Sequence, residues 1–250
     1  MYFFDSRVRY SEIGEDKKMT LNSLLNYFQD CTTFHSASLG RGMEILEKTG
    51  CAWVLSSWQV CINRFPTLGE NIRVCTWPYE FRGFYGSRNF RMLTEQDEVL
   101  AYANSLWSFL DMRTGRPTRV TPEEAQAYPL EEKLDMEYAP RKILIPEDMK
   151  NIDQYEVKKH HLDTNHHVNN VQYVRMAQDY LPADFCIGQM RAEYKKQALS
   201  GDRIIIMVET AGDICTVALC DEEQKPYAVV EFQKADRMRQ KQNIENGEDR

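Results

Sequence analysis

The sequence predicts an α+β protein of two similar halves, each an antiparallel sheet with one helix lying on it. A strand-like segment, a polar junction, a helix-like segment and about four further strand-like segments follow one another twice along the 250 residues. The two copies can also be brought into register, with residues of similar type at corresponding positions. Self-similarity of this kind indicates a duplicated structural unit.

The register between the halves holds at two spacings. Val8 and Val157 lie 149 positions apart, and the same spacing relates Ile13 to Leu162. Farther along, a spacing of 132 relates Gly69 with Gly201, Ile72 with Ile204 and Val74 with Ile206. A longer connector between helix and strand in the first half accounts for the decrease in spacing.

In the first half, a strand is expected at 3–13 and a helix at 19–34. The helix is predicted because apolar residues recur at helical spacing and share one face: Leu21, Leu24, Leu25, Phe28 and Cys31. Thr20 precedes this run and suits a helix cap. A mixed connector over 36–50 follows. Apolar and β-branched runs then predict four strands, at 52–65, 71–79, 84–94 and 99–111.

The second half repeats this order after a segment rich in Pro, Glu and Lys, in which a short helix is expected at 122–127. A strand is expected at 155–161, a helix at 171–180, and further strands at 187–197, 203–210, 214–220 and 227–233. The expected domains are an N-terminal unit at 1–125, a linker at 126–150, a C-terminal unit at 151–234, and a charged, disordered tail at 235–250.

Composition excludes several functional classes. The net charge of −7 argues against a general nucleic-acid binder. No apolar run is long enough to span a bilayer, and no secretory signal is visible at the N-terminus. The seven cysteines form no CxxC pair and lie mostly in apolar runs, which is typical of reduced, buried thiols. A cytoplasmic location is therefore expected.

One polar cluster stands out, at 160–173, between the expected strand and helix of the second half. It holds four of the five histidines. At the spacing of 149, Asp163 corresponds to Gly14, Asn165 to Asp16, His167 to Lys18 and Asn169 to Thr20. A purely structural motif would occur in both halves, so the asymmetry indicates a functional site in the second half alone.

The run from Asp163 to Asn170 resembles the Asp-x-Asn-x-His-Val-Asn-Asn signature of acyl-ACP thioesterases. The similarity extends from Arg7 to Gln233 and includes the segments 106–111 and 114–117. Members of this family release fatty acids from acyl carrier protein (ACP) by hydrolysing the thioester. The resemblance implies a tandem, or double, hotdog fold, in which each half is an antiparallel sheet wrapped around a central helix. It further implies an acyl pocket in the N-terminal half and the catalytic site in the C-terminal half.

For this reaction the resemblance implies an active set of Asp163, Asn165 and His167. Hydrolysis needs an activated water and hydrogen-bond donors aimed at the developing oxyanion. His167 is the expected base, because imidazole exchanges protons near neutral pH. The amide of Asn165 would hold the carbonyl or position the water. Asp163 would orient these two residues, contact the water or itself act as the base, and these alternatives stay open.

One departure from the family concerns the strand after the helix. The family carries a carboxylate and a neighbouring Cys there, whereas the matching positions of this chain hold Gln197 and Ala198. Ala198 excludes a thiol nucleophile at that position. Gln197 can hydrogen-bond a water but cannot take its proton. Direct attack by water, assisted by Gln197, is therefore expected.

The partner implied by the resemblance is acyl carrier protein with a fatty acyl chain on its phosphopantetheine arm. Candidate cations for this acidic partner, which would also suit an ordinary solvated surface, are Arg82, Arg88, Arg91, Arg191, Lys195 and Lys196. No cofactor, metal, nucleic acid or membrane span is expected. Pairing into a homodimer stays open.

Three other readings compete with the acyl-ACP thioesterase. One is a hotdog thioesterase that acts on acyl-CoA. Another is a non-catalytic acyl-binding module with a decayed site, which the replacement at Gln197 favours. The third is a hotdog dehydratase, which would need an acid and a histidine in a different arrangement.

Overall fold

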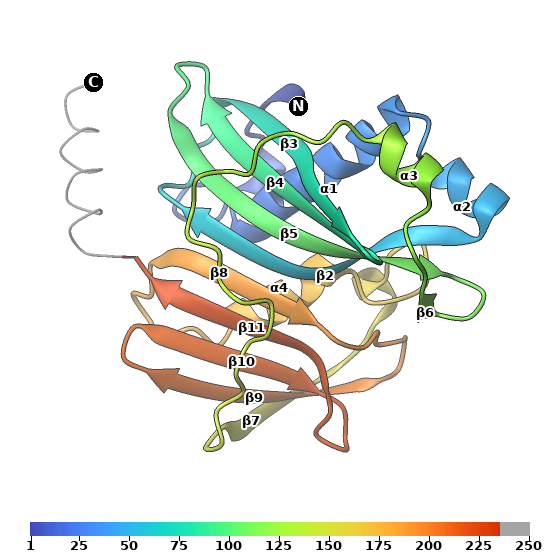
Figure 1. The fold of residues 1–250 in the computed structure, drawn as a ribbon. Coiled ribbons are helices and arrows are strands. Elements are labelled where there is room, and N and C mark those ends of the chain that lie inside the picture. Colours follow the sequence, from blue (N-terminus) through green and yellow to red (C-terminus); the bar gives the residue numbers. More distant parts are fainter. Residues whose placement is uncertain (236–250) are drawn as a thin grey trace. The chain divides into compact units, whose positions relative to one another are not determined.

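The structure, a computed structural model, describes residues 1–235, apart from the side chains of residues 46 and 47. The chain forms two compact units. One comprises Met1–Ser57 and Phe65–Ala139, and the other comprises Trp58–Arg64 and the chain from Pro140 onward (Figure 1). The boundary at Ala139 falls inside the expected linker, 126–150. Apart from Ala235, the expected disordered tail lies outside the described residues.

The first unit is an antiparallel sheet with a long helix against it. Strands β1 (Tyr2–Arg7), β3 (Asn71–Arg82), β4 (Tyr85–Thr94) and β5 (Val99–Asp111) pair in that order, and β2 (Cys51–Ile62) lies next to β5. Short β6 (Arg116–Pro117) also pairs with β5. Helix α1 (Leu21–Ser38) contacts β1 and β3 (Figure 1). The remaining helices are α2 (Met43–Thr49) and α3 (Pro122–Ala127).

Helix α1 forms where the apolar periodicity predicted it. The hydroxyl of Thr20 accepts a hydrogen bond from the Ser23 amide (3.2 Å) and thereby caps the helix. The predicted apolar face is buried, and Phe28 packs on Phe90 of β4 with ring centroids 5.0 Å apart. The helix continues to Ser38, four residues beyond the expected end.

The second unit repeats this plan. Its strands lie in the order β8 (Ile187–Tyr194), β11 (Pro226–Lys234), β10 (Ile214–Cys220), β9 (Arg203–Ala211) and β7 (Lys150–Glu156), with antiparallel pairing throughout. Helix α4 (Asn170–Gln178) contacts β10 and β11.

The internal repeat is confirmed at the level of single hydrogen bonds. The backbone amides of Val8 and Val157 donate to Glu70 and Asp202, both at 2.9 Å. Three more backbone hydrogen bonds, each written from amide to carbonyl, recur in the second unit at the same two spacings. They are Met19 to Pro66 with Val168 to Ala198, Thr20 to Glu12 with Asn169 to His161, and Gly69 to Val8 with Gly201 to Val157. The two units therefore share one backbone design.

Both strands that precede the helices end earlier than expected. In place of a strand through residue 13, β1 stops at Arg7 and a 3-10 turn occupies Tyr10–Glu12. The carboxylate of Glu12 accepts a hydrogen bond from the Arg9 amide (2.8 Å) and fixes this turn. In the second unit the corresponding turn is Lys159–His161, where Nδ1 of His161 accepts from the Lys158 amide (3.0 Å).

Extended chain covers the sheet face away from the helix in each unit. In the first, Leu134 packs on Cys75 and Trp77, and the Trp77 indole donates to the Glu132 carbonyl (2.8 Å). In the second, Ile143 and Met149 pack over β10 and β11. Both faces are thus buried, which explains why strands such as β4 are buried at consecutive positions. Within the described residues, no helix is long and apolar enough to cross a membrane.

Candidate active site

The predicted catalytic residues lie on a tight loop between the 3-10 turn and helix α4 of the second unit. An antiparallel bridge between Leu162 and Val168 closes the loop at its base. Inside it, the Asp163 amide donates to the His167 carbonyl (2.8 Å). The short closure fixes the backbone of residues 163–167, which include the three predicted active residues Asp163, Asn165 and His167.

The carboxylate of Asp163 organises the loop from within. Its Oδ1 atom accepts hydrogen bonds from the backbone amides of Asn165 (2.8 Å) and His167 (3.3 Å). This is an Asx-type turn, in which a side chain replaces a backbone acceptor. His166 takes a left-handed conformation (φ 61°), which His tolerates better than most residues. Asp163 therefore positions the two residues that were predicted to act on substrate.

The side chains of Asn165 and His167 are available to a ligand. Asn165 is exposed and His167 is half-buried, and neither side chain forms a hydrogen bond with another residue in the described part of the chain. The loop also precedes the N-terminus of α4, which carries the positive end of the helix dipole. A negative charge that develops on a substrate oxygen here would be stabilised.

A neighbouring segment is fastened to the loop and carries Gln197. The Val168 amide donates to the Ala198 carbonyl (3.0 Å), and the Ala198 amide donates to the hydroxyl of Tyr173 (2.9 Å). His167 precedes Val168 and Gln197 precedes Ala198, so the hydrogen bond between Val168 and Ala198 holds the two segments together next to these residues. The Gln197 side chain is exposed and makes no hydrogen bond to another described residue.

The prediction that Gln197 lies on a strand is wrong. Strand β8 ends at Tyr194, and the amides of Lys195 and Lys196 both donate to the single carbonyl of Tyr227 (2.8 and 3.1 Å). The chain thus leaves the regular ladder before it reaches Gln197. Glu193, the last acid on β8, does not replace the missing carboxylate, because it is buried against the Ile143 amide (3.1 Å).

Tyr173 is a positioning residue that the sequence did not reveal. It lies on α4, is 2% exposed, and supplies the hydroxyl that holds the Ala198 amide. Burial raises the pKa of Tyr173, so its hydroxyl stays neutral. In the sequence, Tyr173 lies within a helical run of apolar residues and cannot be distinguished from an aromatic residue of the core.

Some of the other polar residues of the cluster have structural roles. The side chain of Asn169 caps α4 by accepting from the Val171 amide (2.9 Å). His161 is buried, and its ring stacks edge-on against His160 at 4.2 Å between centroids. Burial lowers the pKa of His161. Within residues 1–235, no group of three or more His, Cys, Asp or Glu is arranged to hold a metal ion.

The corresponding loop of the first unit has the same backbone without the chemistry. The Gly14 amide donates to the Lys18 carbonyl (2.9 Å), and Asp16 accepts from the Lys18 amide (3.0 Å). Lys17 is left-handed (φ 62°), as His166 is in the second unit. The loop geometry is therefore a property of the repeat, whereas the imidazole and amide are additions to one copy.

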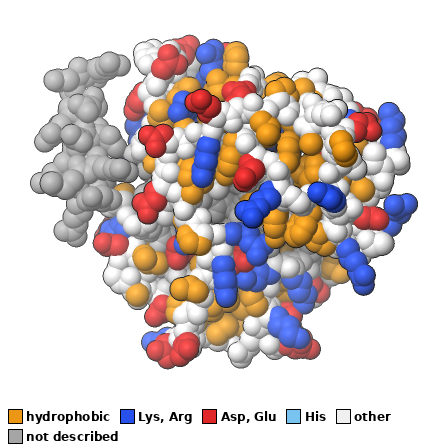
Figure 2. All heavy atoms as spheres, viewed as in Figure 1, with side chains coloured by type: hydrophobic (Ala, Val, Ile, Leu, Met, Phe, Trp, Pro, Cys, Tyr) orange, Lys and Arg blue, Asp and Glu red, His pale blue; other side chains and the backbone are white. Residues whose placement is uncertain are grey.

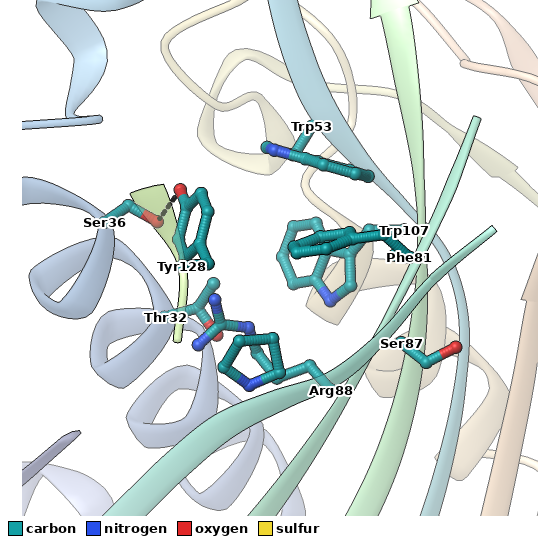
Figure 3. A pocket seen from close by; sticks show the side chains of 10 residues that line it. Thr32, Ser36, Trp53, Phe81, Ser87, Arg88, Trp107 and Tyr128 are labelled. Carbon is teal, nitrogen blue, oxygen red and sulfur yellow. Dashed lines mark hydrogen bonds between the residues drawn. The ribbon is translucent and has the colours of Figure 1, made fainter. Parts of the chain in front are cut away.

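The first unit contains a small cavity of about 30 Å³ (Figure 3). Its walls are largely aromatic, with Trp53, Phe81, Trp107 and Tyr128 around it. Arg88 of β4 and Thr32 of α1 supply polar groups on one side. Nη1 of Arg88 donates to Nδ1 of His35 (2.9 Å). This cavity lies in the unit for which an acyl pocket was expected.

The prediction that Arg88 contributes to a surface for an acidic carrier is wrong, because the residue is only 6% exposed. The three cations of the second unit are engaged in ion pairs: Arg191, which is largely buried, with Glu231 (2.8 Å), Lys195 with Glu193 (2.9 Å) and Lys196 with Asp221 (2.7 Å). Figure 2 shows Lys and Arg side chains among acidic and hydrophobic ones on the face drawn.

Acid should destabilise the first unit through His35. Burial and the adjacent Arg88 guanidinium lower the pKa of His35 to about 4. The pKa of histidine in the unfolded chain is about 6.5, so between pH 6.5 and pH 4 His35 is protonated in the unfolded chain but not in the folded chain. The free energy of unfolding should therefore fall as the pH drops through this range, by up to about 3 kcal/mol.

Denaturant unfolding of wild type and His35→Gln at pH 7 and pH 4 measures this contribution. The glutamine does not titrate, so the variant should lose less stability on acidification than wild type. Equal losses in the two proteins would show that another group is responsible.

Two family models match the chain in succession. Residues 2–128 match the acyl-ACP thioesterase N-terminal domain, and residues 145–246 match the acyl-ACP thioesterase C-terminal domain. The two matches follow the two halves of the internal repeat, and the second includes the loop at 162–168.

Curated relatives are similar at low identity. An acyl-[acyl-carrier-protein] hydrolase, FATB1, chloroplastic, from Cuphea viscosissima is 24% identical over 214 residues, which cover 76% of this chain and 49% of the relative. A palmitoyl-acyl carrier protein thioesterase, chloroplastic, from Gossypium hirsutum is 26% identical over 230 residues, or 82% and 54% of the two chains. The chain thus spans about half the length of the curated relatives it matches.

Solved structures establish the fold. An acyl-ACP thioesterase from Bacteroides thetaiotaomicron superposes with a TM-score of 0.86 at 19% identity, covering 93% of this chain and 97% of the other. The 12:0-ACP thioesterase from Umbellularia californica gives a TM-score of 0.81 at 21% identity, with coverage of 93% and 97%. The predicted double-hotdog fold is confirmed.

Proposed function

Because the chain belongs to the acyl-ACP thioesterase family, we propose that it hydrolyses the thioester of a fatty acyl group on acyl carrier protein and releases the free fatty acid. The observation that carries the proposal is the loop at 162–168. Asp163 fixes this loop internally and leaves Asn165 and His167 without other partners among the described residues. The same loop in the first unit lacks both groups.

In the proposed reaction, the imidazole of His167 takes a proton from water as the water oxygen attacks the thioester carbonyl carbon. The carbonyl oxygen becomes an oxyanion, which the amide of Asn165 and the N-terminal end of α4 stabilise. The tetrahedral intermediate then collapses and the carbon–sulfur bond breaks. The departing phosphopantetheine thiolate takes the proton back from the imidazolium, and the acid leaves.

We assign Asp163 a positioning role. Of the two candidate general bases, Asp163 and His167, His167 is therefore the one that takes the proton. The Oδ1 atom of Asp163 already accepts hydrogen bonds from two backbone amides of the loop, so the carboxylate is engaged in holding the loop. Gln197 is assigned the role of a hydrogen-bonding partner for the attacking water, because it adjoins the loop through the bond from Val168 to Ala198. An amide cannot accept the proton itself.

Direct attack by water agrees with the cysteine chemistry. Position 198 is alanine, and all seven cysteines are free thiols. Burial raises the pKa of Cys31 to about 12 and that of Cys220 to about 11. These thiols stay protonated and are poor nucleophiles.

Gln197→Ala should lower kcat by roughly three- to tenfold, because it removes about one hydrogen bond to the water, worth ~1 kcal/mol. Gln197→Glu should restore or raise activity and make it dependent on ionisation of the new carboxylate. Steady-state kinetics and pH profiles of both variants measure this. Full activity in Gln197→Ala would remove the residue from the mechanism.

Turnover itself distinguishes an enzyme from a decayed acyl-binding module. The purified protein is incubated with acyl-ACP, and free fatty acid and holo-ACP are quantified over time. We expect many equivalents of acid per protein chain. Retention of the acyl-ACP without release of acid would overturn the hydrolase proposal and favour the binding module.

The proposal includes a cytoplasmic location, supported by seven free cysteines, which suit a reducing compartment. The names of the curated relatives place those proteins in chloroplasts. Fractionation of the source cells, with the protein followed by antibody, tests the assignment. Recovery in an organelle or membrane fraction would contradict it.

A further inference from the structure

Two tyrosine hydroxyls of the second unit join helix α4 to the segment that carries Gln197. Tyr173 of α4 accepts a hydrogen bond from the backbone amide of Ala198, the residue after Gln197 (2.9 Å). Tyr194, the last residue of β8, donates in the opposite direction to the carbonyl of Asn170, the first residue of α4 (3.1 Å). The centroids of the two rings lie 6.2 Å apart. We call this pair of hydrogen bonds the tyrosine brace.

The first half of the repeat lacks both partners of the bond between Tyr173 and Ala198. Tyr173 corresponds to the buried Leu24 at the spacing of 149. Ala198 corresponds to Pro66 at the spacing of 132. Leucine has no group that accepts a hydrogen bond, and proline has no amide hydrogen to donate. The donor and the acceptor are therefore present together in one half and absent together in the other.

Tyr194 shows the same contrast between the halves. Its counterpart at the spacing of 132 is Ile62, a buried apolar residue. The shared backbone needs neither hydroxyl, because the amide of Met19 donates to the carbonyl of Pro66 (2.8 Å) where the second unit has the matching bond to Ala198. Burial raises the pKa of Tyr194, so its hydroxyl keeps the proton that it donates. The tyrosine brace is therefore an addition to the half that carries the predicted site.

The exchange of Pro66 for Ala198 changes how the segment is held. A proline restricts the backbone of the residue before it, which is Phe65 in the first half and would be Gln197 in the second. Alanine at position 198 removes this restriction from Gln197 and supplies an amide, which Tyr173 anchors. A hydrogen bond thus fixes the segment next to Gln197, while Gln197 keeps a wider choice of backbone conformation.

We propose that Tyr173 and Tyr194 are positioning residues that hold Gln197 beside the loop at 162–168, where its side-chain amide meets the attacking water. The tyrosine brace acts through two backbone groups, the amide that follows Gln197 and the carbonyl at the start of α4. Each hydroxyl is bonded to one of these groups, so it acts through Gln197 and not on the substrate. This role rests on the proposed function, which assigns Gln197 to the water.

Tyr173→Phe and Tyr194→Phe each remove one hydroxyl and keep the ring. Each should lower kcat for acyl-ACP hydrolysis by roughly three- to tenfold with KM nearly unchanged, which is the loss expected from Gln197→Ala itself. Added to Gln197→Ala, either substitution should lower kcat by less than about twofold more, because the group that the brace positions is already gone. Equal decreases in the two backgrounds would show a general structural effect and overturn the proposal.

Tyr180→Phe is the matched control within the same unit. The hydroxyl of Tyr180 donates to Asp153 (2.6 Å) and lies beyond the C-terminal end of α4, whereas the loop precedes its N-terminal end. The control variant should therefore keep the kcat of wild type. A loss as large as that in Tyr173→Phe would leave the brace without a specific role and overturn the proposal.

A double variant, Tyr173→Leu with Ala198→Pro, places the residues of the first half in the second unit. It should be more stable than Tyr173→Leu alone, in which the amide of Ala198 has lost its acceptor. Its kcat should nevertheless stay roughly three- to tenfold below that of wild type, because a proline again restricts Gln197. Wild-type turnover in the folded double variant would overturn the proposal, and this comparison decides the question even where a phenylalanine variant fails to fold.

Hydrogen exchange of the Ala198 amide, followed by NMR in the full chain, tests the brace without turnover. Tyr173→Phe should raise the exchange rate at least about fivefold, since the amide loses its acceptor. An unchanged rate would overturn the proposal. Absence of turnover in wild type would overturn the proposed hydrolase activity alone, because the exchange rates still decide whether the hydroxyl holds the segment.

Discussion

His167→Ala should lower kcat for acyl-ACP hydrolysis by roughly 10²- to 10⁴-fold, the usual contribution of a general base. The His167 side chain makes no hydrogen bond to another described residue, so its removal should change the free energy of unfolding little. Kinetics on acyl-ACP, with circular dichroism and denaturant unfolding of the same preparations, separate the two effects.

The matched control for this variant is His166→Asn. It removes an exposed imidazole from the same loop, and asparagine tolerates the left-handed conformation at this position (φ 61°). Turnover should stay near that of wild type. Activity retained in His167→Ala, or lost equally in His166→Asn, would refute the assignment of His167 as the base.

Asp163→Ala should lower kcat/KM by about 10²-fold, because misplacement of catalytic groups by about an ångström has costs of this size. The substitution leaves the amides of Asn165 and His167 without the acceptor that fixes the loop. Lost hydrogen bonds at a partly buried site should also reduce the free energy of unfolding by ~1–3 kcal/mol.

Two further variants distinguish positioning from proton transfer. Asp163→Asn keeps a side-chain oxygen that can accept a hydrogen bond, so it should recover much of the activity lost in Asp163→Ala. If Asp163 were the base, the asparagine variant would be as inactive as the alanine one. Asp16→Ala removes a side-chain acceptor within the first unit's loop, where Asp16 accepts from the Lys18 amide, and should cost stability without slowing turnover.

The elements that followed from the sequence are those whose signal is periodic or repeated. Helices α1 and α4 were predictable because their apolar residues recur at helical spacing and polar residues cap their N-termini. The duplication was predictable because residues of similar type recur at two fixed spacings, and matching backbone hydrogen bonds, such as Val8 to Glu70 and Val157 to Asp202, occur at the same spacings.

The elements that did not follow depend on a single local interaction. The 3-10 turns at Tyr10–Glu12 and Lys159–His161 continue an apparently strand-like run, and local hydrogen bonds, including those to the side chains of Glu12 and His161, hold the turns. The end of β8 at Tyr194 depends on one carbonyl, that of Tyr227, which accepts two amides. The pattern of apolar residues in a sequence carries no information about such single contacts.

Two parts of the functional picture needed the tertiary structure. Arg88 was expected on the surface as a candidate cation for an acidic carrier, but extended chain and helix α1 cover both faces of that sheet. Tyr173 was indistinguishable from a core residue until its hydroxyl was found on the Ala198 amide. By contrast, the loop residues Asp163, Asn165 and His167 were identifiable because only one half carries them.

The most direct test of the central claim compares carriers. The same acyl group is presented on acyl carrier protein and on coenzyme A, and release of free fatty acid by the purified chain is followed at matched concentrations. The proposed function predicts a higher kcat/KM for acyl-ACP, and loss of that hydrolysis in His167→Ala. Faster turnover of acyl-CoA, or hydrolysis of neither thioester, would contradict it.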